Sequence, residues 1–174
     1  MIFLTGGASS GKSRLAVEAL AGWAGAVSYI ATGLETDEEM TERIAAHRRA
    51  RPAAWELIEE PIDLAGALGV VSSEAAVIVD CLTLWVSNLM ESLSDEEIVG
   101  LSDVTAETAA ERLAPTIVVS NEVGSGLVPL SAVGRRFRDL HGRVNQTWAG
   151  LSEEAYLTVA GRTVVLGSGA NLLG

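Results

Sequence analysis

The chain has 174 residues, about the length of one domain, and 48% of its side chains are hydrophobic while 20% are charged. Disordered chains combine low hydrophobicity with high charge, so this composition predicts a folded globular protein. Twenty-three acidic against twelve basic residues give a formal net charge of -11, which repels phosphate backbones and anionic lipids and argues against nucleic-acid and membrane partners.

Three further features favour a cytoplasmic protein. The single Cys81 excludes an intrachain disulfide and fits a reducing compartment. The segment from Met1 to Gly7 lacks the basic region and long apolar stretch of a secretion signal. The longest uncharged stretch, residues 19–34, is shorter than the roughly 20 apolar residues of a spanning helix. We therefore expect one domain over residues 1–174, without membrane insertion.

Strands and helices are predicted to alternate along the chain. In chain order they are strand 2–5, helix 12–23, strand 26–31, a helix opened by a capping box at 36–39 and ending before Pro52, helix 64–71, strand 76–80, helix 82–90, a surface helix 93–113, strand 116–120, helix 131–151, and strands 156–159 and 163–166. Such alternation predicts an α/β fold, a mostly parallel sheet with helices on both faces.

One motif in this frame carries phosphate chemistry. It matches G-x-x-x-x-G-K-S, the phosphate-binding P-loop, through Gly6, Gly7, Ala8, Ser9, Ser10, Gly11, Lys12 and Ser13. The glycines let backbone N–H groups surround phosphate oxygens, the lysine reaches the β- and γ-phosphates, and the serine hydroxyl is a ligand for Mg²⁺. The motif lies between a predicted strand and a predicted helix and contains the chain's only lysine. A glycine-rich turn with a surface lysine is the weaker interpretation.

An acid at the end of another strand would complete such a site by holding Mg²⁺ through water. Asp80 ends one apolar strand and Glu122 follows another, so the two compete for this role. Both should lie near the phosphates, because the carboxyl ends of parallel strands face the ligand. Asp80 is the more natural candidate, and its simpler interpretation is a cap for the next helix.

His47 is a candidate nucleophile. It is followed by Arg48, Arg49 and Arg51, a concentration of positive charge in a strongly acidic chain that suggests an anion site. A histidine with a free pKa of about 6.5 is largely neutral at pH 7 and can attack phosphorus. A packed core histidine is the alternative. Residues 135–143 hold a second basic group that fits either a solvated face or a phosphate site.

Several segments together resemble one enzyme family, the bifunctional adenosylcobinamide kinase/adenosylcobinamide-phosphate guanylyltransferases of cobalamin biosynthesis. The resemblance runs from Met1 to about Leu166. It is carried by TGGASSGKS at 5–13, YIAT at 29–32, DEEM at 37–40, HRRARPAAW at 47–55, DCLT at 80–83, SNEVGSGLVP at 120–129, FRD at 137–139 and GRVNQ at 142–146.

The resemblance implies two reactions and a RecA-like P-loop fold. In the first, a nucleoside triphosphate, ATP or GTP, phosphorylates adenosylcobinamide. In the second, a histidine attacks the α-phosphorus of GTP, expels pyrophosphate and carries GMP to adenosylcobinamide phosphate. The guanylylated histidine of the family falls on His47, with Lys12 as the second catalytic residue. A homotrimer is also implied.

The nucleotide contacts that the resemblance implies lie in four further places besides the P-loop. They fall on Ala31, Thr32, Gly33, Arg48, Arg49, Arg51, Glu59 and Asp80, with Mg²⁺ bound by Ser13 and Asp80.

Two rival functions keep the P-loop but not this chemistry. A P-loop small-molecule kinase without guanylyltransferase activity would need no nucleophilic histidine. A GTPase-type switch would need the N-K-x-D motif, which cannot exist here because Lys12 is the only lysine.

Overall fold

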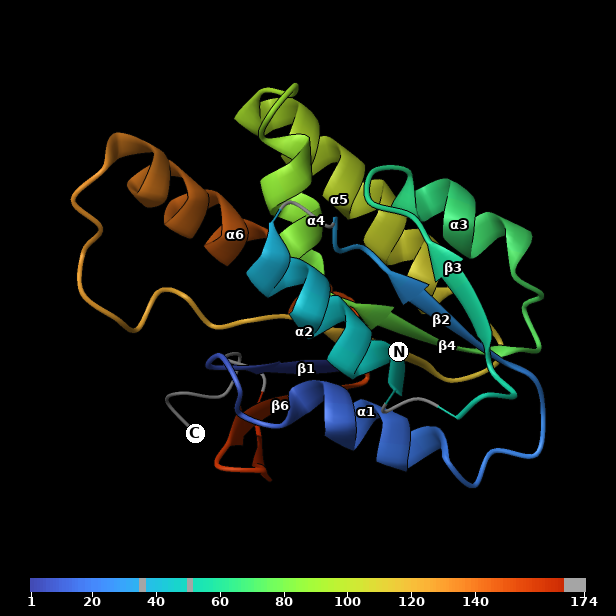
Figure 1. The fold of residues 1–174 in the computed structure, drawn as a ribbon. Coiled ribbons are helices and arrows are strands. Elements are labelled where there is room, and N and C mark those ends of the chain that lie inside the picture. The colour runs from blue at the N-terminus through green and yellow to red at the C-terminus, as the bar shows by residue number, and fades with distance from the viewer. Residues whose placement is uncertain (35–36, 50–51, 168–174) are drawn as a thin grey trace.

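The computed structural model describes residues 1–34, 37–49 and 52–167, leaving aside the side chains of residues 39, 40, 43, 46, 47 and 49 (Figure 1). Its strands form one sheet in the order β3-β2-β4-β5-β1-β6-β7. They are β1 (Ile2–Gly6), β2 (Val27–Ala31), β3 (Glu56–Glu59), β4 (Ala76–Asp80), β5 (Thr116–Val119), β6 (Glu154–Val159) and β7 (Arg162–Val165). The helices are α1 (Lys12–Leu20), α2 (Glu38–Arg49), α3 (Leu64–Val70), α4 (Leu82–Leu89), α5 (Asp95–Ala110) and α6 (Ala132–Leu151).

The sheet is parallel from β3 to β6, and only β7 runs antiparallel, to β6. The carboxyl ends of six strands therefore meet at one edge. This confirms the predicted α/β class and agrees with a P-loop fold of RecA type.

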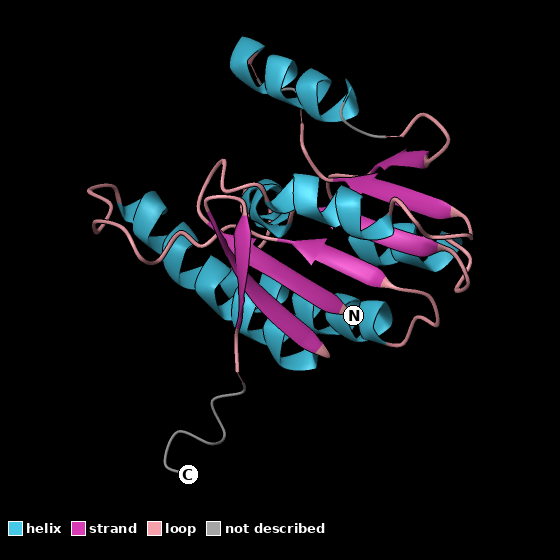
Figure 2. Ribbon diagram, turned by 90° about the horizontal axis from the view of Figure 1, so that it is seen from below, coloured by secondary structure: helices cyan, strands magenta, loops and turns pink. Residues whose placement is uncertain are grey.

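Helices cover both faces of the sheet, as predicted (Figure 1). Helix α1 packs on one face over a small apolar cluster that includes Ala16, Leu20 and Tyr29. Helices α3 to α6 pack on the other face, where the larger cluster is centred on Trp85 and Trp148, whose rings meet edge to face at 6.5 Å. Helix α2 stands apart from both layers (Figure 2). In the part of the chain that the structure describes, no helix is both long and apolar enough to cross a membrane.

Two elements differ from the sequence prediction. The edge strand β3 was not predicted, because its four residues alternate only weakly between apolar and charged side chains and remain largely exposed. The predicted surface helix is α5, and one of its faces is buried, with Ile98, Ala106 and Ala109 in the core. Its small buried polar residue Ser102 accepts a hydrogen bond from Trp148 Nε1 at 3.0 Å.

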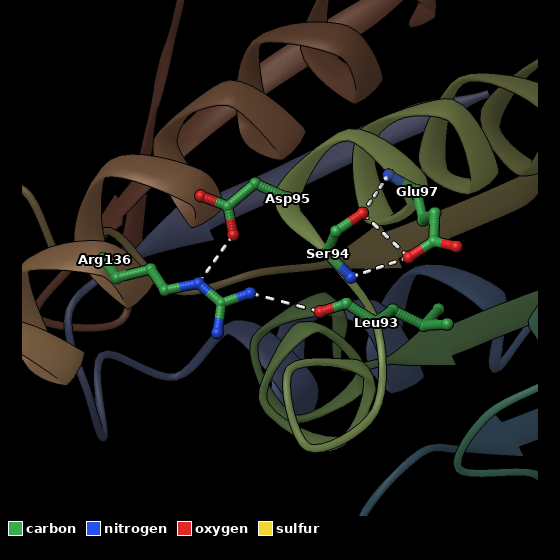
Figure 3. A network of polar contacts seen from close by, with 5 residues as sticks. All are labelled: Leu93, Ser94, Asp95, Glu97 and Arg136. Carbon is green, nitrogen blue, oxygen red and sulfur yellow. Dashed lines mark hydrogen bonds and ion pairs between the residues drawn. The ribbon is translucent and has the colours of Figure 1, made fainter.

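Charged side chains join α5 to α6 (Figure 3). Ser94 and Glu97 form a capping box at the start of α5. The guanidinium of Arg136, from α6, donates to Asp95 Oδ1 at 2.6 Å and to the Leu93 carbonyl at 3.1 Å. This arginine of the second basic group thus stabilises a helix–helix contact.

Arg112, just after α5, holds the loop between α3 and β4. Its guanidinium donates to four backbone carbonyls, those of Leu68 at 3.1 Å, Val71 at 3.1 Å, Ser72 at 2.6 Å and Ala75 at 2.8 Å. These acceptors come from the end of one helix and the turn that follows it. A single side chain therefore supplies a donor to one carbonyl in the last turn of α3, where carbonyls lack partners within the helix, and to three carbonyls in the turn after it.

Replacing Arg112 with Met should lower the free energy of unfolding by about 2 kcal/mol, because hydrogen bonds from a charged group are lost while the carbonyls stay partly buried. Urea titration of the wild type and the variant would measure this. Arg14→Met is the matched control, since Arg14 pairs with Glu18 on an exposed helix face and the loss of this pair should cost about 0.5 kcal/mol or less. Equal losses in the two variants would contradict the prediction.

Candidate functional site

The P-loop connects β1 to α1 and wraps around its own lysine. Lys12 is almost fully buried, and its Nζ donates to the carbonyls of Gly6 at 2.8 Å and Gly7 at 2.7 Å and to Ser10 Oγ at 3.3 Å. Residues 7–9 form the exposed rim of the loop, and Ser13 is half-buried in the first turn of α1. The ammonium thus lies inside the loop beside the start of a helix, the arrangement that binds phosphate.

Glycine is required at two positions of this loop. Gly6 has φ 147°, and a Cβ there would lie 2.2 Å from the Thr158 carbonyl oxygen of β6. Gly11 has φ 100°, and a Cβ there would lie 3.3 Å from the Cα of Gly161. The backbone of the loop therefore approaches the backbone of the β6–β7 hairpin more closely than any side chain would allow.

Two backbone hydrogen bonds fix the loop from outside. The Gly161 N–H, at the tip of the β6–β7 hairpin, donates to the Ser10 carbonyl at 2.8 Å. The Glu122 N–H, beyond β5, donates to the Gly6 carbonyl at 2.9 Å. The loop is therefore supported by the two strands that flank β1 in the sheet.

The other predicted contacts gather along the carboxyl edge of the sheet. Ala31, the last residue of β2, lies opposite Asp80 of β4 on one side and Glu59 of β3 on the other. Thr32 and Gly33 follow, and Gly33 is enclosed by the side chains of Leu84 and Ile44. From β1 to β4 there are two interstrand steps, or about 10 Å. Asp80 therefore lies within reach of a polyphosphate bound in the P-loop.

The structure separates the roles of Asp80 and Glu122. Asp80 Oδ2 accepts a hydrogen bond from the buried Tyr29 hydroxyl. Glu122 Oε1 instead accepts from the N–H of Ser125 at 3.1 Å and from that of Gly124, so this carboxylate closes its own turn. Asp80 is thus the acid that ends a strand at the candidate site, in line with the preference drawn from the sequence.

The residues predicted around the nucleophile are only partly described. Helix α2 carries His47, whose side chain lies outside the described part of the chain, as does that of Arg49 and all of Arg51. Arg48 is described, and its guanidinium pairs with the Glu59 carboxylate at the end of β3. The structure thus pairs two residues of consecutive elements, both predicted to contact nucleotide, and ties α2 to the edge of the sheet.

Behind this edge lies a buried polar network that the sequence analysis did not identify. His141 of α6 is fully buried, and its Nε2 lies 3.0 Å from the Asn121 carbonyl and 3.2 Å from Ser120 Oγ. The Asn121 N–H donates to Thr83 Oγ1 at 2.8 Å, and Asn145 Nδ2 donates to the Asn121 carbonyl at 3.0 Å. The network therefore holds the loops after β4 and β5 together.

Cys81, next to Asp80, is not a nucleophile at neutral pH. Burial raises the pKa of its thiol to about 11, and the negative charge of Asp80 adds to the shift. A thiol needs to ionise to attack phosphorus. Cys81 therefore contributes packing.

The donor set of this edge fits Mg²⁺. The half-buried Ser13 hydroxyl and Asp80 carboxylate are hard oxygen ligands, the kind that Mg²⁺ prefers together with phosphate oxygens and water. Ser13 and Asp80 both lie at the edge of the sheet where β1 and β4 end.

Comparison with known proteins decides the family. A family model described as cobinamide kinase / cobinamide phosphate guanyltransferase matches residues 2–166. The chain belongs to this family. The match covers the P-loop, α2 and the whole carboxyl edge of the sheet.

Curated relatives in this family cover nearly the whole chain. A bifunctional adenosylcobalamin biosynthesis protein of Pseudomonas aeruginosa is 45% identical over 160 residues, which are 91% of this chain and 92% of the relative. Counterparts of Escherichia coli and Salmonella typhimurium are 38% and 39% identical over 175 residues, 92% of this chain and 96% of theirs. A solved structure from Pyrococcus horikoshii superposes with TM-score 0.57 at 8% identity, covering 98% of this chain and 87% of that one, which shows a likeness of fold alone.

Several residues of the site had no predicted role. Tyr29, Asn88, His141 and Asn145 are polar groups within otherwise apolar strands or helix faces, and this was the signal that could have identified them. Their partners could not be deduced, because each lies at least twenty residues away in the chain.

The buried histidine should make stability depend on pH. Burial lowers the pKa of His141 below its usual 6.5, so between the two values the unfolded chain binds more protons than the folded one. Wild-type stability should therefore fall as the pH drops through about 6.5. His141→Gln should be destabilised at pH 7.5, and its deficit should narrow toward pH 5.5. Urea titrations across this range measure the difference, and a deficit independent of pH would contradict the prediction.

Proposed function

We propose that this chain catalyses both reactions of its family. In the first it phosphorylates the hydroxyl of adenosylcobinamide with a nucleoside triphosphate. In the second it transfers GMP from GTP to adenosylcobinamide phosphate, giving adenosylcobinamide-GDP and pyrophosphate. The observation that carries the proposal is the P-loop with its enclosed Lys12, in a chain that matches the family over residues 2–166. The curated relatives named above are described as bifunctional.

The kinase reaction belongs to the P-loop end of the edge. Lys12 and the loop N–H groups bind the β- and γ-phosphates of ATP or GTP and stabilise the charge that develops on them. Ser13 and Asp80 would hold Mg²⁺, which would neutralise phosphate charge at this place. The oxygen of the substrate hydroxyl attacks the γ-phosphorus and gives its proton to water, and the electron pair of the broken P–O bond leaves with the nucleoside diphosphate.

The guanylyl transfer belongs to the α2 end of the edge. A ring nitrogen of His47 attacks the α-phosphorus of GTP, a P–N bond forms, and pyrophosphate leaves with the electron pair of the broken P–O bond. A phosphate oxygen of adenosylcobinamide phosphate then attacks the same phosphorus and the P–N bond breaks. Arg48, Arg49 and Arg51 balance phosphate charge, and the pairing of Arg48 with Glu59 supports the placement of this helix beside Ala31, Thr32 and Gly33.

A reaction in two halves suits a chain whose site residues are spread along one edge. Between β1 and β3 there are four interstrand steps, or about 19 Å. A covalent intermediate lets each bulky anion approach one phosphorus centre at a time. We infer that one domain over residues 1–174 carries both activities, and that it acts in the cytoplasm, where these nucleotides are available.

The proposal predicts that a histidine becomes labelled. Incubation with Mg²⁺ and GTP radiolabelled at the α-phosphate should label the wild type with an acid-labile, alkali-stable bond, as a phosphoramidate requires. His47→Ala should carry no label yet still phosphorylate adenosylcobinamide, because that reaction needs no nucleophilic histidine. Lys12→Ala should lose at least about 100-fold in the kinase rate, since it removes a main charge from the phosphate site.

The controls separate the two halves of the proposal. Unlabelled wild type that still binds GTP would leave the alternative, a P-loop small-molecule kinase without guanylyltransferase activity. Label retained in His47→Ala would move the nucleophile to another residue. A wild type that phosphorylates no cobinamide would rule out the kinase half.

We further propose that the chain forms a homotrimer, as the resemblance implies. Supporting this, the segment before α6 extends from the body of the molecule (Figure 1). Its large apolar side chains are exposed. Leu127 is 97% exposed and Leu130 is 99% exposed, and Val128 and Val133 are also exposed. Apolar side chains gathered in this way are typical of surfaces that a partner covers.

Light scattering on a size-exclusion column should give three times the chain's mass for the wild type. The double variant Leu127→Ser, Leu130→Ser should shift toward the monomer, because it removes apolar area from the proposed contact. Val70→Ser, at an exposed position of α3, is the control and should leave the mass unchanged. A monomeric wild type would overturn this part of the proposal.

A further inference from the structure

Two side chains of one segment, Tyr29 and Thr32, form hydrogen bonds with the end of β4, where Asp80 lies. The Tyr29 hydroxyl donates to Asp80 Oδ2. Thr32 Oγ1 donates to the Cys81 carbonyl at 2.7 Å and accepts from the Cys81 N–H at 2.9 Å. One hydroxyl thus holds the carboxylate itself and the other holds the residue that follows it.

The backbone strengthens this connection. The Thr32 N–H donates to the Asp80 carbonyl at 3.1 Å, and Ala31 lies opposite Asp80 in the sheet. Asn88 of α4 donates to the Thr32 carbonyl at 2.8 Å, so Thr32 is held in turn. The position of the Asp80 carboxylate is therefore defined by β2 and α4 as well as by β4.

Packing of the fold alone does not require these two hydroxyl groups. Tyr29 is 2% exposed and packs in the apolar cluster beneath α1, where a phenylalanine would fill nearly the same volume. Thr32 is 0% exposed, where a valine would have the same shape. Burying a hydroxyl costs free energy unless it is hydrogen-bonded, and here the hydroxyls bond to Asp80 and to the peptide next to it.

We propose that Tyr29 and Thr32 are positioning residues that fix the Asp80 carboxylate for binding the metal–nucleotide complex. The inference rests on the proposed function only in taking Asp80 as a group that faces the nucleotide's metal ion. Groups that hydrogen-bond to a metal-binding side chain restrict its orientation and raise the affinity of the site. On this proposal the Thr32 side chain acts through Cys81 and Asp80, and the nucleotide contacts at this turn come from other atoms of residues 31–33.

The test measures metal binding directly. Mn²⁺ replaces Mg²⁺ as the probe, and electron paramagnetic resonance gives its dissociation constant in the presence of saturating GTP. Tyr29→Phe and Thr32→Val should each raise this constant about tenfold. Asp80→Asn should raise it at least as much, and Thr32→Ser, which keeps the hydroxyl, should restore the wild-type value.

Matched controls remove a hydroxyl elsewhere. Tyr156→Phe loses the bond from a half-buried tyrosine to Glu154, and Thr108→Val loses a bond within α5. Neither should change Mn²⁺ binding. GTP affinity in EDTA should stay the same in Tyr29→Phe and Thr32→Val, because these variants keep the Asp80 charge and positioning of the carboxylate matters only when the metal is present.

Three results would overturn the inference. The first is Mn²⁺ binding at the wild-type level in Tyr29→Phe, and the second is Mn²⁺ binding unaffected by Asp80→Asn. The third is a loss of GTP affinity in EDTA, in Tyr29→Phe or Thr32→Val, as large as the loss of Mn²⁺ affinity. If Thr32→Val does not fold, Tyr29→Phe and Thr32→Ser decide the matter. The assay needs no turnover, so failure of the labelling or kinase experiments would count against the proposed function and leave this inference to stand on metal binding alone.

Discussion

The close approach of two backbones, at Gly6 of β1 and Thr158 of β6, is the constraint on which the candidate site depends. A Cβ at Gly6 would lie 2.2 Å from the Thr158 carbonyl oxygen, so only glycine allows the strands to meet here. This contact lets the chain leave the sheet, turn around Lys12 and begin α1. Every other predicted site residue is placed relative to that turn, along the edge where the parallel strands end.

Along that edge there are two groups of polar side chains. One group faces the candidate site, and the other hydrogen-bonds to the loops and helices that carry the first. Ser120 and His141 are buried, Asn145 is half-buried, and their hydrogen bonds connect the residues that follow β4 and β5. Hydrogen bonds in a buried network are strong and restrict the groups that they join. Within the described part of the chain, His141 Nδ1 has no hydrogen-bond partner, so this network is not fully satisfied. It gives the edge a defined shape without contributing atoms to the exposed rim of the P-loop.

The sequence predicted the fold and the P-loop because both signals are local. Short apolar runs marked the strands, and the spacing of glycines, Lys12 and Ser13 marked the loop. The strand β3 was missed because an exposed, four-residue edge strand carries almost no periodic signal. The buried network was missed because it joins residues from three distant segments, and only the fold brings His141 beside Asn121. The resemblance implied Arg48 and Glu59 as separate nucleotide contacts, and their pairing with one another came from the fold.

The support of the P-loop by β6 has a consequence for synthesis on the ribosome. The loop occupies residues 6–13, yet the strand against which it packs and the hairpin tip that bonds to Ser10 belong to residues 154–161. Strand β1 also needs both β5 and β6 as neighbours. The loop at residues 6–13 is thus completed by a segment that is translated much later, and a nascent chain without β6 lacks the strand against which the phosphate loop packs. The loop can therefore take its final shape only after residues 154–161 have been translated.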